Sequence, residues 1–210
     1  MKKDKCMVNY EKLILNFANN LQNKIILDYG CGNGNYTMLF SKNNNRVMGV
    51  DIVDLRHKRY QKKFIFSKYD GKKLPYESNS CDIVTSFDVI EHVEDDANYI
   101  KEAKRVLKRG GELFLATPNR TRLSNTILKL IGRSVKYPLV LSEGGRLGPV
   151  VHVREYISEE LKILLENQGF NKIIIRPFWF GLRGSINTGI CYPLIPYLSQ
   201  YLFVTARKNK

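Results

Sequence analysis

The sequence has little of what stabilises small extracellular proteins. Its four cysteines are far apart and form no C-x-x-C pair, which excludes an ordinary zinc ribbon and a disulfide framework. The first five residues are mostly basic, but no apolar segment follows them, so they do not read as a signal peptide. We therefore expect a cytoplasmic protein in which the thiols stay reduced. The cysteines are Cys6, Cys31, Cys81 and Cys191.

Acidic residues are scarce compared with basic ones, 20 against 34, which gives a net charge of +14. Such an excess favours polyanionic partners or anionic membrane surfaces, but it also serves solubility alone. The basic residues are densest between residues 56 and 73, where they form no uninterrupted block. The charge alone therefore identifies no partner.

Charged residues are missing altogether from residues 184–206, a stretch long enough to span a bilayer. Gly189, Pro193 and Pro196 interrupt its hydrophobicity. We interpret the stretch as a sheet-packing segment with a loop and expect no membrane span.

Short apolar runs alternate with helical patterns along the chain. Apolar runs that end in an acid or a turn are typical of buried parallel strands. The alternation predicts one α/β domain with a mostly parallel sheet, and 210 residues suit a single domain. The expected strands cover residues 24–28, 46–51, 63–67, 81–86, 111–117, 172–177 and 201–206, and the expected helices cover 8–22, 93–107, 123–131 and a segment from Ser158, as N-cap, to about Gln168.

The most informative motif is the glycine loop DYGCGNG at residues 28–34. Glycines between a strand and a helix permit a tight turn and let a ligand approach the backbone, and we expect a helix to begin near Asn35. The dinucleotide fingerprint G-x-G-x-x-G requires a third glycine where this chain has Asn35. Asp28 would also repel a pyrophosphate. Spacing and charge therefore favour a cationic amino-acid nucleoside over NAD.

Two further acids follow predicted strands. Asp51 ends the second strand about 20 residues after the loop, where an acid binds the hydroxyls of a ribose, although a strand-end Asp is often only a turn former. Asp70 follows the third strand and suits an adenine amino group, but a simple Asp-Gly turn explains it nearly as well.

These motifs together resemble a known family. The segments DYGCGNG, VMGVD, CDIVTSFDVIEHVED and LKRGGELFLATPN, in this order, are similar to class I S-adenosylmethionine-dependent methyltransferases, most closely the ubiquinone- and menaquinone-type small-molecule group. The resemblance is good over residues 20–120 and continues more weakly through HVREYISEELKILLENQGF and QYLFVTARK. It implies a Rossmann-like sheet of seven strands, the last antiparallel, with helices on both faces.

The resemblance also implies site residues and a division of the domain. The implied cofactor is S-adenosylmethionine, with a helix in residues 1–22, a cofactor-binding half in 23–118, a substrate-covering insertion in 119–155 and a C-terminal helix and strands in 156–210. The implied cofactor-binding residues are Gly30, Gly32 and Gly34 beneath the methionine, Asp28 near its amino group, Asp51 on the ribose, Ile52 and Asp70 at the adenine, and Phe87 lining the pocket.

Methyl transfer to a hydroxyl is helped by a general base, for which His92 and His152 are the candidates. Each has a structural alternative: His92 as a residue that holds a loop, and His152 as a surface residue. We expect no metal site, because a metal-assisted site needs clustered acids. The acids of the EHVEDD segment, Glu91, Glu94, Asp95 and Asp96, look more like the solvated start of a helix.

The acceptor is expected to be a partly apolar small molecule methylated on oxygen. The insertion, together with residues 178–180 and 192–198, is rich in apolar side chains that suit such a substrate, although core packing explains them as well. No Pro-Pro-Tyr motif or Pro-Cys nucleophile follows the fourth strand, which argues against nucleic-acid base methylation. The alternatives are an RNA- or protein-directed methyltransferase and a non-catalytic cofactor-binding partner subunit, acting as a monomer or homodimer.

Overall fold

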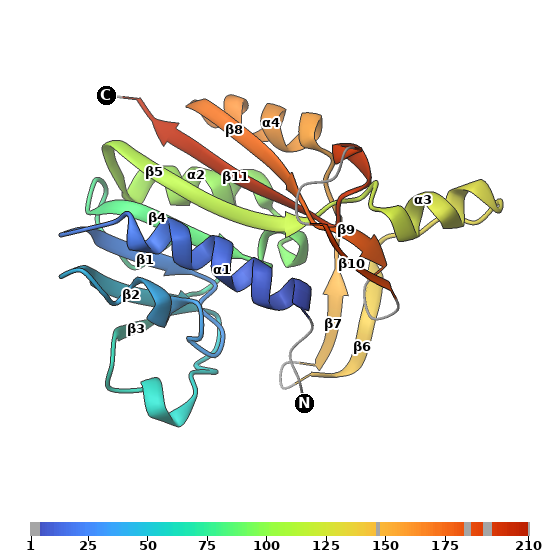
Figure 1. The fold of residues 1–210 in the computed structure, drawn as a ribbon. Coiled ribbons are helices and arrows are strands. Elements are labelled where there is room, and N and C mark those ends of the chain that lie inside the picture. Colours follow the sequence, from blue (N-terminus) through green and yellow to red (C-terminus); the bar gives the residue numbers. More distant parts are fainter. Residues whose placement is uncertain (1–4, 146–147, 183–185, 191–194, 210) are drawn as a thin grey trace.

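A seven-stranded sheet forms the centre of the molecule in the computed structural model, which describes residues 5–145, 148–182, 186–190 and 195–209 (Figure 1). The strand order is β3-β2-β1-β4-β5-β11-β8. β11 runs antiparallel to both of its neighbours, and the other pairs are parallel. The strands are β1 (Ile25–Tyr29), β2 (Arg46–Asp51), β3 (Ile65–Lys68), β4 (Cys81–Phe87), β5 (Leu107–Pro118), β8 (Phe170–Phe178) and β11 (Tyr201–Lys208). The predicted Rossmann-like α/β fold is confirmed, with the antiparallel strand last.

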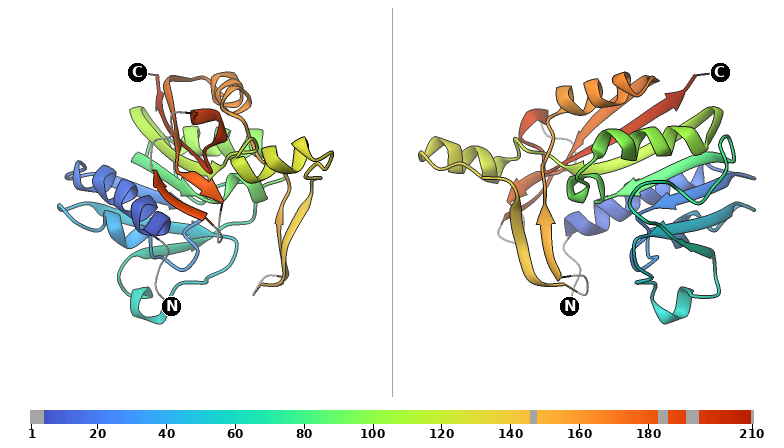
Figure 2. Two further views of the ribbon diagram at one scale, coloured as in Figure 1. Left: turned by 45° about the vertical axis from the view of Figure 1, so that its right-hand side comes forward. Right: turned by 180° about the vertical axis from the view of Figure 1, so that it is seen from behind.

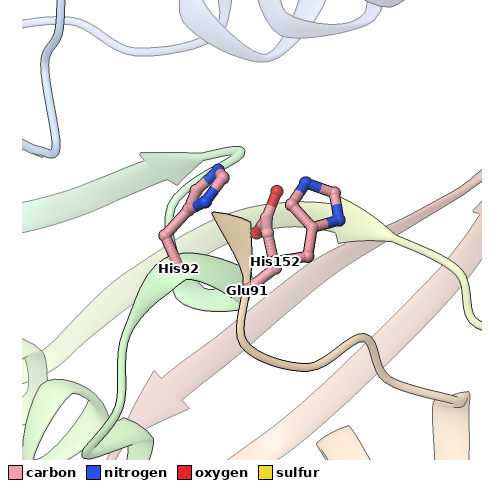
Figure 3. Close-up of side chains that lie close together, drawn as sticks. All are labelled: Glu91, His92 and His152. Carbon is pink, nitrogen blue, oxygen red and sulfur yellow. The ribbon is translucent and has the colours of Figure 1, made fainter. Parts of the chain in front are cut away.

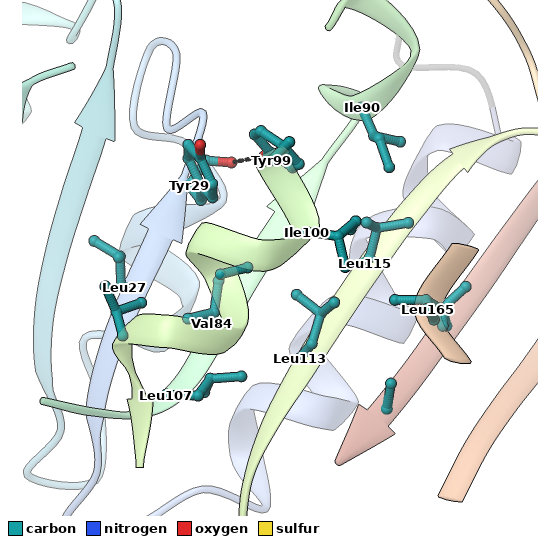
Figure 4. Close-up of a cluster of buried hydrophobic side chains, with 14 of the residues drawn as sticks. Leu27, Tyr29, Val84, Ile90, Tyr99, Ile100, Leu107, Leu113, Leu115 and Leu165 are labelled. Carbon is teal, nitrogen blue, oxygen red and sulfur yellow. Dashed lines mark hydrogen bonds between the residues drawn. The ribbon is translucent and has the colours of Figure 1, made fainter. Parts of the chain in front are cut away.

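Helices cover both faces of this sheet, as predicted (Figures 1 and 2). α1 (Lys5–Asn19) packs on one face with buried Tyr10 and Ile14 against residues such as Phe114. α2 (Asp96–Val106) and α4 (Ser158–Asn167) pack on the other face. Figure 4 shows this second core, in which side chains of α2 and α4 meet those of β1, β4 and β5.

Two helix starts differ from the prediction. α2 begins at Asp96 because the Asp95 side chain accepts a hydrogen bond from the Asn98 N–H at 2.9 Å and so caps the helix. β5 begins at Leu107, earlier than the predicted strand at 111–117, so it follows α2 directly. Ser158 is the first residue of α4 and not its N-cap, a position that Ile157 occupies.

The helix expected after the glycine loop is replaced by the short 3-10 helix η1 (Thr37–Phe40). Asn43 and Asn44 follow it closely and adopt positive φ angles of 54° and 56°, which turn the chain toward β2. Only residues 35–42 separate the loop from this turn, and of these Thr37–Phe40 form the 3-10 helix. The prediction of a helix near Asn35 was therefore wrong.

The segment between β5 and α4 projects from the sheet (Figures 1 and 2). α3 (Leu123–Leu130) stands away from the body, and β6 (Leu139–Gly145) and β7 (Gly148–His152) form an antiparallel hairpin. The sequence predicted this helix but neither strand of the hairpin. β9 (Phe180–Leu182) and β10 (Ile186–Ile190) form a second two-stranded sheet that was not predicted either.

Among the described residues, no helix has the length and apolar content needed to cross a membrane. The uncharged stretch 184–206 lies partly outside the described residues. Where it is described, it forms β10, the short helix η4 (Pro196–Leu198) and most of β11, so its end packs in the sheet as expected.

The packing of the sheet allows a matched test of the core. Leu113 on β5 is 0% exposed in the core that β5 forms with α2 and α4, whereas Leu130 at the end of α3 is 81% exposed. We expect Leu113→Ala to lower the free energy of unfolding by about 2–5 kcal/mol, because it leaves a cavity. Leu130→Ala should change it by no more than about 0.5 kcal/mol. Urea unfolding followed by circular dichroism measures both, and equal effects would contradict the assignment of the core.

Candidate functional site

The glycine loop after β1 has a backbone that glycine adopts most readily. Gly30, Gly32 and Gly34 have φ angles of 87°, 49° and 83°. A Cβ on Gly30 would lie 2.3 Å from a methyl carbon of Val89, so this glycine permits close packing. A Cβ on Gly32 would meet no atom within 4 Å, so the loop is open on that side. The loop therefore packs on the protein at Gly30 and remains accessible at Gly32.

Asp51 at the end of β2 ties the loop to the neighbouring strand. Its carboxylate accepts hydrogen bonds from the N–H groups of Gly32 at 2.8 Å and Ile52 at 2.7 Å. Burial raises the pKa of Asp51, and the backbone hydrogen bonds act against this rise. A carboxylate can accept about four hydrogen bonds, so lone pairs remain for the two hydroxyls of a ribose. The neighbouring Ile52 side chain is 49% exposed and offers an apolar surface beside them.

Asp28 lies buried behind the loop. Its two oxygens accept hydrogen bonds from the Thr37 hydroxyl at 2.5 Å and the Thr85 hydroxyl at 2.9 Å. Burial raises the pKa of Asp28 to about 6, although both hydroxyls lower it. In this geometry Asp28 holds η1 and β4 to β1, a role that the sequence did not reveal. Its contact with an amino group stays a prediction.

The positions of Asp70 and Phe87 give less support to their predicted roles. Asp70 is exposed and accepts hydrogen bonds from the N–H groups of Lys72 and Lys73, as in a simple Asp-Gly turn. Phe87 ends β4 and packs in the core against Phe40 and Phe114. Their roles at the adenine and in the pocket stay predictions.

The two candidate bases lie together. The rings of His92 and His152 have their centroids 4.9 Å apart, although the residues are 60 positions apart in the sequence. His92 Nδ1 lies 2.6 Å from the Val151 carbonyl oxygen, and burial lowers the pKa of this imidazole. His152 is buried, so its interpretation as a surface residue was wrong.

Glu155 supports His152 and was missed in the sequence. Its carboxylate lies 2.7 Å from His152 Nδ1, accepts a hydrogen bond from the Tyr137 hydroxyl at 2.7 Å and pairs with Arg122. Burial acts to raise the pKa of Glu155, but the hydrogen bonds from His152 and Arg122 outweigh it and hold the pKa at about 2. Glu155 is therefore ionised at neutral pH. Only its place three residues after His152 could have suggested this pairing.

The acids of the EHVEDD segment differ in environment. Asp95 caps α2, Asp96 binds Arg154 at 2.7 Å and Glu94 is exposed, in agreement with a helix start. Glu91 is 0% exposed, and its Oε2 accepts a hydrogen bond from the Thr117 hydroxyl at 2.9 Å. The interpretation of Glu91 as a solvated residue was wrong, because the short helix η3 (Ile90–His92) turns its side chain into the protein.

The glycine loop and the histidine pair are connected. Val89, which touches Gly30, is followed by η3 with Glu91 and His92. The Glu91 carbonyl accepts a hydrogen bond from the Val153 N–H at 2.8 Å, which brings His152 to the same place. These groups lie where the parallel strands end, on the side from which α3, β6 and β7 project (Figure 1). One edge of the sheet therefore holds both the loop and the bases.

The fold and this edge define a Rossmann-like nucleotide-type site at the carboxyl ends of parallel strands. Comparison with solved structures agrees on the fold. A S-adenosylmethionine-dependent methyltransferase of Archaeoglobus fulgidus superposes with a TM-score of 0.68 at 19% identity, covering 99% of this chain and 96% of that chain.

Sequence comparisons identify the family. Residues 27–115 match the model of the methyltransferase domain. A demethylmenaquinone methyltransferase of Lactobacillus johnsonii is 31% identical over 78% of this chain and 74% of its own length. A probable S-adenosylmethionine-dependent methyltransferase of Mycolicibacterium smegmatis is 31% identical over 77% of this chain and 57% of its own length. A mitochondrial ubiquinone biosynthesis O-methyltransferase of Bos taurus is 31% identical over 80% of this chain and 48% of its own length.

This chain belongs to the S-adenosylmethionine-dependent methyltransferases, as the resemblance implied. It spans little more than half the length of the mycobacterial relative. The residues present fit the family's cofactor. The loop is open beside Gly32, Asp51 has lone pairs free for a ribose, and Ile52 exposes an apolar surface for an adenine.

Cofactor binding can be tested at Asp51. We expect S-adenosylmethionine but not NADH to bind, and Asp51→Ala to weaken that binding at least about tenfold, because a hydrogen-bonded carboxylate contributes about 1.5–3 kcal/mol. Isothermal titration measures both. Asp70→Ala serves as the comparison and should have the smaller effect. Preference for NADH, or an Asp51→Ala variant that binds as well as the wild type, would overturn the assignment.

The pKa of Asp28 predicts a pH dependence of stability. Because the folded-state pKa of about 6 exceeds the ordinary value of 3.8, the favourable contribution is full below about pH 4 and is lost as the pH rises through 6. Relative to Asp28→Asn, the wild type should gain up to about 3 kcal/mol of unfolding free energy between pH 7 and pH 4. Urea unfolding at both pH values measures this. The exposed Asp54, compared with Asp54→Asn, should show no such gain.

Proposed function

We propose that this protein transfers the methyl group of S-adenosylmethionine to an oxygen atom of a partly apolar small molecule. The cofactor, when bound, supplies a methyl group on a sulfonium whose departure requires no proton. The chain must then orient the acceptor and remove the proton of its hydroxyl. The observation that carries the proposal is the buried His152–Glu155 pair at the edge that holds the glycine loop.

His152 has the arrangement of a general base. The ionised Glu155 accepts a hydrogen bond from the Nδ1–H of His152. The lone pair of Nε2 is then free in the neutral ring. The acceptor's O–H proton would move to Nε2 as the new O–C bond forms and the S–C bond breaks. Glu155 would then stabilise the imidazolium, as a carboxylate does in other carboxylate–histidine pairs.

His92 is the alternative proton acceptor, and the two rings are not equivalent. Burial and the proximity of His152 both lower the pKa of His92. Its Nδ1 faces the Val151 carbonyl, which has no full negative charge to stabilise an imidazolium. These contacts favour His152 as the base and His92 as a neutral partner.

The insertion supports an acceptor with apolar bulk. Ile131, Val140 and Leu141 expose 63%, 50% and 47% of their surface on the segment that projects beside the site. The names of two relatives refer to demethylmenaquinone and to ubiquinone biosynthesis, and we extend this chemistry to a quinone-like phenol as acceptor. Phe178 and Trp179 are buried in the core, so packing explains them, and residues 192–194 of the apolar 192–198 segment lie outside the described residues.

RNA- or protein-directed methylation is the second candidate, and the exposed charge favours it. Lys58, Lys62, Lys72 and Lys73 are exposed in the segments between β2 and β4. Phosphate contacts would make activity fall steeply as salt rises. Activity on a phenol that is insensitive to salt would favour the small-molecule proposal, and cofactor binding without transfer to either class would favour a non-catalytic partner subunit.

The base can be tested by kinetics. His152→Gln should lower kcat on a hydroxylated quinone-like acceptor by about 10²–10⁴-fold, because a positioned base contributes this much. Binding of S-adenosylmethionine should be unchanged. Transfer of a labelled methyl group from saturating cofactor measures kcat, and titration measures binding.

The control is the exposed His57, whose His57→Gln variant should retain the wild-type kcat. Glu155→Gln should lower kcat less than His152→Gln and leave cofactor binding intact. A His152→Gln variant with wild-type kcat would refute the role of the base.

A further inference from the structure

Three groups with available lone pairs converge beside the glycine loop. The potential ligand atoms of Glu91, His92 and His152 all lie within 4.8 Å of one another. Figure 3 shows the Glu91 carboxylate between the two imidazole rings, with Glu91 and His92 on η3 and His152 at the end of β7. We call these three residues the Glu–His–His cluster.

The hydrogen bonds of the two rings determine which nitrogen is free. His92 Nδ1 faces the Val151 carbonyl oxygen, which only accepts, so Nδ1 carries the hydrogen. His152 Nδ1 faces Glu155, which is ionised, so Nδ1 carries the hydrogen in this ring too. In the neutral rings both Nε2 atoms are therefore acceptors. A neutral imidazole with this tautomer is the form that binds a metal ion.

Glu91 adds a third acceptor that lacks a donor. Its Oε2 accepts from Thr117, but Oε1 is buried and has no hydrogen-bond partner in the described part of the chain. A buried polar atom without a partner is destabilising, and a charged one is more so. Three acceptors without a donor between them are stabilised by a cation, either a proton or a metal ion.

We propose that the Glu–His–His cluster binds a divalent transition-metal ion of the Zn²⁺ type. Two imidazole nitrogens and one carboxylate form a donor set that zinc uses in catalytic sites, whereas Mg²⁺ prefers oxygen ligands. Tetrahedral ligands about 2.0–2.1 Å from zinc lie roughly 3.3 Å apart, so binding draws the three side chains together.

The surroundings have the features of a built metal site. Each ligand has an outer partner that orients it: Val151 for His92, Glu155 for His152 and Thr117 for Glu91. Such outer contacts fix the tautomer and the orientation of metal ligands. With three protein ligands, a fourth position stays available for another oxygen.

The binding of a metal ion to the cluster does not depend on the proposed function. The role of that ion in methyl transfer rests on the proposed function. A hydroxyl bound to the ion would lose its proton to solvent more easily, so the ion would replace His152, whose Nε2 is then a metal ligand, in preparing the acceptor oxygen for methylation. The Val89–Gly30 contact places this position next to the methyl donor's loop. This reverses the expectation from the sequence that the protein has no metal site.

Titration of the chelator-treated, tag-free full chain with Zn²⁺ and with Mg²⁺ tests the proposal. We expect one Zn²⁺ per chain and much weaker Mg²⁺ binding. Glu91→Gln and His152→Gln should each weaken Zn²⁺ binding at least about 10–100-fold, and Glu155→Gln, which removes an outer partner, about tenfold. The Co²⁺ form should show the absorption of nitrogen and oxygen ligands without a thiolate charge-transfer band.

His57→Gln is the matched control and should bind Zn²⁺ like the wild type. Circular dichroism confirms that each variant is folded, and His92→Gln replaces any variant that is not. Three results would overturn the metal site and leave a proton as the cation. They are no Zn²⁺ binding by the wild type, Zn²⁺ binding that Glu91→Gln and His152→Gln leave unchanged, and thiolate absorption in the Co²⁺ form. If methyl transfer persists in the metal-free chain, the proposed function stands, but the metal ion has no part in it.

Discussion

The contact between Gly30 and Val89 determines how the site is assembled. The loop after β1 and the segment after β4 approach so closely that a Cβ on Gly30 would lie 2.3 Å from Val89. Because η3 follows Val89 directly, this contact also places Glu91 and His92 beside the loop. The insertion then joins the same segment through the Val153–Glu91 and His92–Val151 hydrogen bonds. A single steric requirement at a glycine thus relates the cofactor loop, the candidate bases and the insertion to one another.

Three buried carboxyl groups in this region show how hydrogen-bond and charged partners determine the pKa of a carboxyl group. Asp28 has two neutral hydroxyl donors, and burial raises its pKa to about 6. Glu155 has Arg122, His152 and Tyr137, which together hold its pKa at about 2 despite burial. Glu91 has one hydroxyl donor and nearby acids, and burial together with those acids raises its pKa well above the ordinary value. Similar burial therefore yields a carboxyl that anchors a loop, a carboxylate that supports an imidazole and a carboxyl that requires a cation.

The sheet could be predicted because its strands are short apolar runs, a signal that needs no knowledge of distant contacts. Asp51 could be predicted as well, because its spacing from the glycine loop follows from the βαβ geometry. The missing helix after Gly34 and the β6–β7 hairpin depend on turns and pairings that local pattern does not specify. Glu91 and Glu155 could not be recognised, since an acid in the sequence is normally exposed and only the folded chain shows these two buried. The sequence thus predicts the sheet and the acid beside the glycine loop better than it predicts the turns, the hairpin and the buried acids.

The match to the family model also divides the residues of the candidate site. The matched methyltransferase domain, residues 27–115, contains the glycine loop, Asp51, Glu91 and His92. It ends before Arg122, Tyr137, His152 and Glu155, which belong to the insertion or its end. The family model therefore supports the methyl donor, whereas His152, the base that we propose, lies beyond the matched residues. His92 and His152 come from opposite sides of that boundary, so the histidine pair exists only where the insertion packs on η3.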